Sequence, residues 1–128
     1  MNKDNINSKS YNEFIKNNPG TGYLKIRAYA ANGAIPVRGL NIVISNYIDG
    51  SNVIFFEGST NESGVIDKIS LPAPIINSND LVIPNYITYD LRAYIDNKVD
   101  KLYKVNIFDG VSVIQNISIS PLGSEYGS

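Results

Sequence analysis

The stretch GYLKIRAYAANGAIPVRGLNIVISNY, residues 22–47, decides the fold class of this 128-residue chain. Apolar side chains alternate with polar or amphipathic ones in residues 23–29, and the alternation returns in residues 40–47 after the Asn32-Gly33 turn signal. A period of two places the apolar side chains on one face of a strand. Both segments are therefore predicted to be half-buried β-strands.

The same pattern continues to the C-terminus, with turn sequences rich in Asn, Asp, Gly, Ser and Pro between the apolar runs. Further strands are predicted at residues 53–60, 65–71, 86–95, 102–108 and 111–119. The Asp109-Gly110 pair between the last two strands predicts a hairpin, because Asp-Gly favours the positive φ angles of tight turns. In residues 65–71, alternation predicts one face made by Val65, Asp67, Ile69 and Leu71.

Seven strands at nearly even spacing, with no room for helical crossovers, predict an all-β fold. We expect a seven-stranded antiparallel β-sandwich with Ig-like Greek-key connections at residues 22–122. Residues 1–21 are polar and are interpreted as an N-terminal arm, and residues 123–128 as a C-terminal tail. In the arm, a small apolar group at residues 11–15 has the spacing for one or two helical turns.

The composition excludes several classes of chemistry. There is no Cys and no His, so disulfides, thiol chemistry, Cys/His zinc sites and a histidine general base are all excluded. Eleven basic and twelve acidic residues leave no surplus to neutralise phosphates, so no nucleic-acid partner is expected. No apolar run is long enough for a membrane span. The N-terminus has no signal-peptide core, so we expect synthesis in the cytoplasm.

Carboxylates are the remaining candidates for catalysis. Five of them fall in or beside predicted turns, where they stabilise the backbone locally: Glu57, Glu62, Asp96, Asp100 and Asp109. No spacing motif joins two of them as an acid and base pair. We predict a protein that is not an enzyme, with no cofactor, no catalytic residue and no metal. A calcium site at residues 96–100 stays an alternative, although the EF-hand spacing is absent.

The nine tyrosines suggest a binding surface. Such residues often pack at the rim of a sandwich, but an exposed Tyr also stacks on sugars because it joins an apolar ring to a polar tip. Seven of them are candidates: Tyr23, Tyr29, Tyr47, Tyr86, Tyr89, Tyr94 and Tyr103. The first strand projects one group away from its apolar face, and this is the predicted surface patch: Tyr23, Lys25, Arg27 and Tyr29.

Two motifs resemble a known group of sandwiches. Residues 33–42, GAIPVRGLNI, resemble the opening segment "x-A-x-P-V-x-G-A-x-V" of carboxypeptidase-regulatory-like and Cna B-type domains, which are similar to transthyretin in topology. Residues 60–66, TNESGVI, resemble their "T-(N/D)-x-x-G" turn. The resemblance covers about residues 18–122 and implies a transthyretin-like, Cna B-like sandwich.

Shorter segments resemble a version of this domain in clostridial proteins, from the non-catalytic region of spore cortex-lytic and peptidoglycan-binding proteins. They lie at residues 55–58, 63–66, 71–74, 86–91 and 107–110. This resemblance implies a binding or scaffolding module at the bacterial cell envelope or spore, with a protein partner or a cell-wall glycan. The alternative is a structural subunit of a surface or phage-tail-like assembly, in which open strand edges pair between copies.

Some Gram-positive surface sandwiches join a Lys and an Asn through an internal isopeptide bond, assisted by a buried carboxylate. Lys25 and Asn116, on the first and last predicted strands, raise this alternative. The alternation places Lys25 out of phase with the apolar residues, and it leaves no acidic residue at a core position of a central strand. We predict two exposed polar residues.

Overall fold

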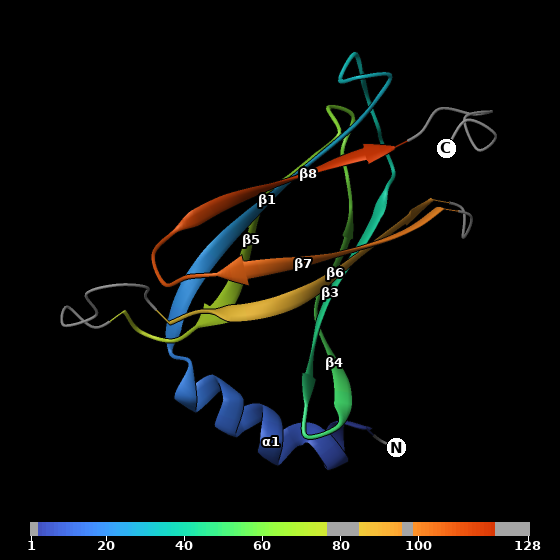
Figure 1. The fold of residues 1–128 in the computed structure, drawn as a ribbon. Helices are drawn as coiled ribbons and strands as arrows, with labels where there is room; N and C mark the ends of the chain where they lie inside the picture. The colour runs from blue at the N-terminus through green and yellow to red at the C-terminus, as the bar shows by residue number, and fades with distance from the viewer. Residues whose placement is uncertain (1–2, 77–84, 96–98, 120–128) are drawn as a thin grey trace.

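The computed structural model describes residues 3–76, 85–95 and 99–119, which form one helix and eight strands in two packed sheets (Figure 1). The predicted all-β sandwich is confirmed, with eight strands in the described residues instead of seven. The elements are α1 (Lys3–Asn17), β1 (Gly20–Ala30), β2 (Ile35–Pro36), β3 (Asn41–Ile48), β4 (Ser51–Ser59), β5 (Val65–Ala73), β6 (Ile87–Ile95), β7 (Val99–Ile107) and β8 (Ser112–Ile119).

β1 is the centre of the first sheet. It pairs antiparallel with β5, and the short β2 continues along that edge, while β8 pairs in parallel with the other edge. The second sheet is antiparallel throughout, in the order β4-β3-β6-β7. The additional strand is β2, where Ile35 and Pro36 pair with Ala30 and Tyr29. Two exposed residues, one of them a proline, carry too little alternation to signal a strand.

The inner faces of the two sheets make one core of aliphatic side chains around Tyr89. The largest fully buried side chains are Leu24, Ile26, Leu40, Ile42, Ile44, Ile69, Leu71, Tyr89, Leu91, Ile107 and Ile117. Burying each aliphatic side chain contributes about 1.5–3 kcal/mol. The Tyr89 hydroxyl, on β6, donates to the Pro72 carbonyl oxygen on β5 over 2.6 Å. One buried residue thus ties the two sheets together.

The hairpin predicted at Asp109-Gly110 is wrong, because β7 lies in the second sheet and β8 in the first. Within this pair only Gly110 has a positive φ (75°), and Val111 N donates to Phe108 O. These two features define a type II turn. That geometry does not match the twist of a tight hairpin. After this turn the chain crosses to the first sheet, where β8 pairs in parallel with β1. The sandwich is therefore not wholly antiparallel. The tight hairpin joins β3 and β4 at Asp49-Gly50, where φ is 51° and 77°.

Two bulges shift the predicted alternation. In the pairing of β1 with β5 the register shifts between Leu24 and Ile26, so residues 67 and 68 together oppose one residue of β1. Asp67 is therefore exposed, and the single face predicted for residues 65–71 is wrong. In β4, the register shift opposite Ile44 lets both Phe55 and Phe56 pack against the core.

Glycines at the start of β1 let the β7–β8 turn approach closely. A Cβ at Gly22 would lie 2.5 Å from the Phe108 carbonyl oxygen. Thr21 N donates to Asp109 Oδ1 over 3.0 Å, and Gly110 N donates to Thr21 O over 2.8 Å. β1 therefore begins at Gly20, before the predicted start of the sandwich at residue 22. The outer limits proposed from the sequence stay a prediction.

α1 lies across one end of the sandwich, beside the β3–β4 turn (Figure 1). Its 15 residues exceed the one or two turns predicted. Phe14 and Tyr11 contact the Phe55 ring, with centroids 5.5 and 5.6 Å apart, and the Ser10 hydroxyl donates to the Asp49 carboxylate. These contacts hold the C-terminal part of the helix against the sandwich, and packing of this kind stabilises a helix more than local spacing does. No helix in the described residues is long and apolar enough to cross a membrane.

Candidate binding surfaces

The outer face of the first sheet carries the predicted patch. Tyr23, Lys25, Arg27 and Tyr29 alternate with buried residues of β1 and are all half-buried on one face, as the sequence pattern indicates. A hollow of about 380 Å³ lies at one end of the patch, beside Lys68 and Ile114. The face is basic, since Lys25, Arg27 and Lys68 outnumber the carboxylate of Asp67.

Neighbours already contact the polar groups of this patch. Lys25 Nζ lies 3.6 Å from Asp67 Oδ1, and the Arg27 guanidinium lies 5.7 Å from the centroid of the Tyr29 ring. Lys68 Nζ lies 4.6 Å above the Tyr23 ring. The patch exists as a surface, and its role in binding stays a prediction.

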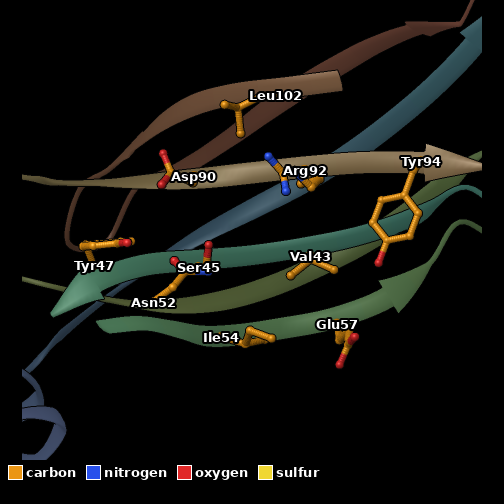
Figure 2. Close-up of a pocket in the computed structure, with 10 residues that line it drawn as sticks. All are labelled: Val43, Ser45, Tyr47, Asn52, Ile54, Glu57, Asp90, Arg92, Tyr94 and Leu102. Atoms are coloured by element: carbon orange, nitrogen blue, oxygen red, sulfur yellow. The ribbon is translucent and has the colours of Figure 1, made fainter. Parts of the chain in front are cut away.

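The outer face of the second sheet contains a larger hollow of about 450 Å³ (Figure 2). Its lining comes from all four strands of the sheet: Val43, Ser45, Tyr47, Asn52, Ile54, Glu57, Asp90, Arg92, Tyr94 and Leu102. Three of these are large apolar or aromatic residues that lie open to solvent: Tyr47 is 67% exposed, Leu102 56% and Ile54 44%. This face therefore leaves more apolar surface uncovered than a scattered single residue would.

Strand register explains how the hollow is assembled. Val43 of β3 lies between Glu57 of β4 and Arg92 of β6, and Arg92 in turn lies beside Leu102 of β7. Figure 2 shows Tyr47 and Tyr94 toward opposite ends of this arrangement, with Val43 and Ser45 between them. The result is a hollow of mixed lining between two tyrosine rings, with Val43, Ser45 and Arg92 on the central strands and Ile54 and Leu102 on the edge strands.

The charges on the second sheet balance. Lys104 Nζ lies 2.6 Å from Asp90 Oδ1, and Glu57 and Arg92 add one charge of each sign. A face without net charge attracts neither anions nor cations at long range, so its ligand preference comes from contact and hydrogen bonding.

Sequence reasoning named Tyr47 and Tyr94 among seven candidates but did not single them out. The missing signal is the long-range order of β4, β3 and β6, which brings them onto one face. Other candidates serve the fold. Tyr89 is fully buried, and burial raises its pKa; burial also raises the pKa of Tyr103, which packs against the core.

The carboxylates considered for catalysis are dispersed. Asp109 is held in the β7–β8 turn by Thr21 N, and Glu62 lies 4.0 Å from Arg38 on the surface. Within residues 3–76, 85–95 and 99–119, no three Asp or Glu side chains gather as a metal site. The loop considered for calcium falls outside the part of the chain whose side chains are described.

The isopeptide alternative is not supported by the register. Lys25 lies opposite Ile114, and Asn116 lies opposite Arg27. The acidic residue beside Lys25 is Asp67, whose side chain is 85% exposed and not buried. The prediction of two exposed polar residues is confirmed for Asn116, whereas Lys25 faces outward and is half-buried.

Comparison with known proteins establishes a fold and no family. No family model and no curated protein matches the chain. The Bacillus anthracis TIE protein is similar, with a TM-score of 0.55 and 14% identity over 79% of this chain. The shaft pilin SpaA from Lactobacillus rhamnosus GG has a TM-score of 0.47 and 13% identity, also over 79%. This chain spans 16% and 48% of those two proteins. The first likeness supports the β-sandwich fold alone.

Proposed function

We propose that this chain is a non-catalytic binding module of the bacterial cell envelope or spore, which contacts cell-wall glycan through the hollow on the second sheet. The observation that carries the proposal is the combination in that hollow of two tyrosine rings, exposed aliphatic side chains and hydrogen-bonding groups. The envelope or spore setting comes from the sequence resemblance to clostridial peptidoglycan-associated domains.

The chemistry of the hollow suits a glycan. Sugar rings present C–H faces that stack on aromatic rings, and Tyr47 offers an open ring of this kind. Hydroxyl and N-acetyl groups of a sugar need donors and acceptors, which the exposed side chains of Asn52 and Glu57 supply. A volume of about 450 Å³ lies within the usual range for small-ligand sites.

The proposal that the module is non-catalytic rests on three observations. The whole sequence has no His and no Cys, which removes the commonest general base and the commonest thiol nucleophile. Asp109 holds the β7–β8 turn to β1, which gives this carboxylate a structural role. Glu57 lies exposed at the hollow, where it serves as an acceptor for a sugar hydroxyl.

Cosedimentation with purified peptidoglycan or spore cortex tests the proposal. We expect wild type to be retained at low salt. Tyr47→Ala should weaken retention about fivefold, because an aromatic contact of this kind is worth about 1 kcal/mol. Tyr29→Ala is the matched control on the first sheet and leaves retention unchanged. Wild type that remains in the supernatant at low salt contradicts the glycan proposal. Loss in Tyr29→Ala alone moves the site to the patch on β1.

A structural subunit of a surface or phage-tail-like assembly is the second candidate function. The observation that favours it is the edge strand β8, which carries no charged residue. Sedimentation of the protein alone tests this candidate, since a subunit of this kind associates with its own copies at high concentration. A strictly monomeric protein contradicts it.

A further inference from the structure

The described strands leave four long open edges, one on each of β4, β5, β7 and β8. An open edge presents unpaired N–H and C=O groups to any other strand, and proteins block it with charges, prolines or bulges. Three of the four edges carry such blocks. They are Glu57 and a bulge on β4, Pro72 with Asp67 and Lys68 in a bulge on β5, and Lys104 on β7.

β8 itself contributes none of these blocks, and Lys101 of β7 reaches its edge at Ser118 O, near the end of the strand. Its sequence, SVIQNISI, has no charged residue, no Pro and no Gly. Its register with β1 runs without a shift from Tyr23 opposite Ser112 to Ala30 opposite Ile119. Ile114, near its middle, is 54% exposed. The strand is thus regular, uncharged and partly apolar.

Backbone geometry shows which groups of β8 face outward. Tyr23 N donates to Val111 O over 2.9 Å, so the β8 groups that face β1 belong to alternate residues from 111 onward. The groups at Ser112, Ile114, Asn116 and Ser118 therefore point to the open edge. Gln115 Nε2 donates to Asn116 O, and Lys101 Nζ donates to Ser118 O. Among the described residues, no side chain forms such a hydrogen bond with the outward backbone groups of Ser112 and Ile114.

We propose that β8 pairs antiparallel with β8 of a second copy, about a two-fold axis at Ile114. This register places Ile114 opposite its own counterpart as a hydrogen-bonded pair and Ser112 opposite Asn116. All the backbone groups that meet then belong to residues that already face the edge. The two first sheets join into one continuous sheet across the two copies.

A second copy suits this edge because the strand is complementary to itself. With no charge on β8, two copies meet without like-charge repulsion across the new ladder. The two Ile114 side chains cover each other, and Ser112 and Asn116 form a polar pair on the outer face. The contact is one strand pair, so the association is weak and appears at high concentration.

The inference develops the second candidate function and does not depend on glycan binding. Sedimentation equilibrium of the full chain, without glycan, tests it over about 10 μM to about 1 mM. We expect the mass of wild type to rise toward that of a dimer. Ile114→Pro removes an N–H at the open edge and spares the ladder to β1, so it abolishes the rise, whereas Ile114→Val retains it.

A second pair of variants guards against misfolding by proline. Ile114→Asp places a carboxylate opposite Lys25 in the β1–β8 register, which is compatible with the folded monomer. It should weaken association at least about tenfold, since two carboxylates then meet across the axis. Ile35→Asp, at an exposed isoleucine of β2 on the other side of β1, leaves association unchanged.

Amide hydrogen exchange supplies a readout specific for strand pairing. The amides of Ser112, Ile114 and Asn116 should exchange more slowly as the protein concentration rises, while the open-edge amides of β4 do not change. A wild type that stays monomeric at the highest concentration overturns both this inference and the second candidate function. Association that persists in Ile114→Asp and Ile114→Pro overturns the β8 pairing and leaves the second candidate function standing.

Discussion

The two outer faces of the sandwich use similar residues in different ways. On the first sheet, the outward tyrosines and cations of β1 contact one another and β5, so Tyr23 and Tyr29 both have a cation near their rings. On the second sheet, Tyr47 is largely open beside apolar residues. The open ring of Tyr47 is the stronger indication of a binding site, because binding a ligand would remove this exposed aromatic surface from water.

The difference teaches that an outward position is not by itself a binding position. Alternation along one strand identifies the outward side chains, but their availability depends on the neighbouring strands. The bulge in β5 brings Asp67 and Lys68 beside β1, where they contact Lys25 and Tyr23. On the second sheet, Val43 and its neighbours Glu57 and Arg92 line a hollow.

The largest loss of stability is expected at Tyr89, which lies in the core between the two sheets. Tyr89 packs between the sheets and its hydroxyl bonds to Pro72, so Tyr89→Ala should lower the free energy of unfolding by about 3–5 kcal/mol. Urea denaturation followed by circular dichroism measures the loss. Tyr47→Ala is the matched surface control and should change stability by less than about 0.5 kcal/mol. Equal losses in the two variants would show that the hollow is part of the core.

A smaller effect separates the hydroxyl from the ring. Tyr89→Phe keeps the packing and removes the bond to Pro72, so the free energy of unfolding should fall by about 1 kcal/mol at neutral pH. Urea midpoints of the two proteins measure this loss. No change in the midpoint would mean that the bond between the two sheets contributes nothing net.

The same residue predicts a response to alkali. Burial raises the pKa of Tyr89 above the ordinary value of 10.0, so the unfolded chain loses this proton at lower pH than the folded chain. The contribution of Tyr89 is complete below pH 10 and declines as pH rises beyond it. Wild type should therefore lose stability above pH 10 more steeply than Tyr89→Phe. Parallel pH curves for the two proteins would contradict the effect of burial.

The sequence predicts the strands better than their partners, and the two Asp-Gly pairs show why. Asp49-Gly50 and Asp109-Gly110 are the same dipeptide between alternating runs, yet only the first closes a hairpin. Asp109 of the second turn accepts a hydrogen bond from Thr21 N of β1, and Phe108 packs closely against Gly22. These partners lie nearly ninety positions apart in the sequence. A contact at such separation leaves no local signal, so the crossover to the first sheet is invisible in the turn itself.

The two candidate surfaces likewise differ in how far the sequence predicts them. The patch on β1 belongs to one strand, so a period of two suffices to find Tyr23, Lys25, Arg27 and Tyr29. The hollow takes residues from four strands whose order β4-β3-β6-β7 follows from pairing across the whole chain. Bulges add a second obstacle, because one inserted residue changes the face of those that follow, as it does at Asp67.

The smallest effect compares one ion pair from each face. Asp90 and Lys104 lie 2.6 Å apart on the second sheet, and the Asp90 side chain is 31% exposed, whereas Lys25 and Asp67 lie 3.6 Å apart with Asp67 85% exposed. Short, partly shielded pairs resist solvent screening better. We expect Asp90→Asn to cost about 0.5–1 kcal/mol and Asp67→Asn less than about 0.3 kcal/mol. Urea midpoints at low and high salt measure both. If Asp67→Asn proved the costlier substitution, contacts on the first sheet would matter to the fold more than its open, solvated geometry suggests.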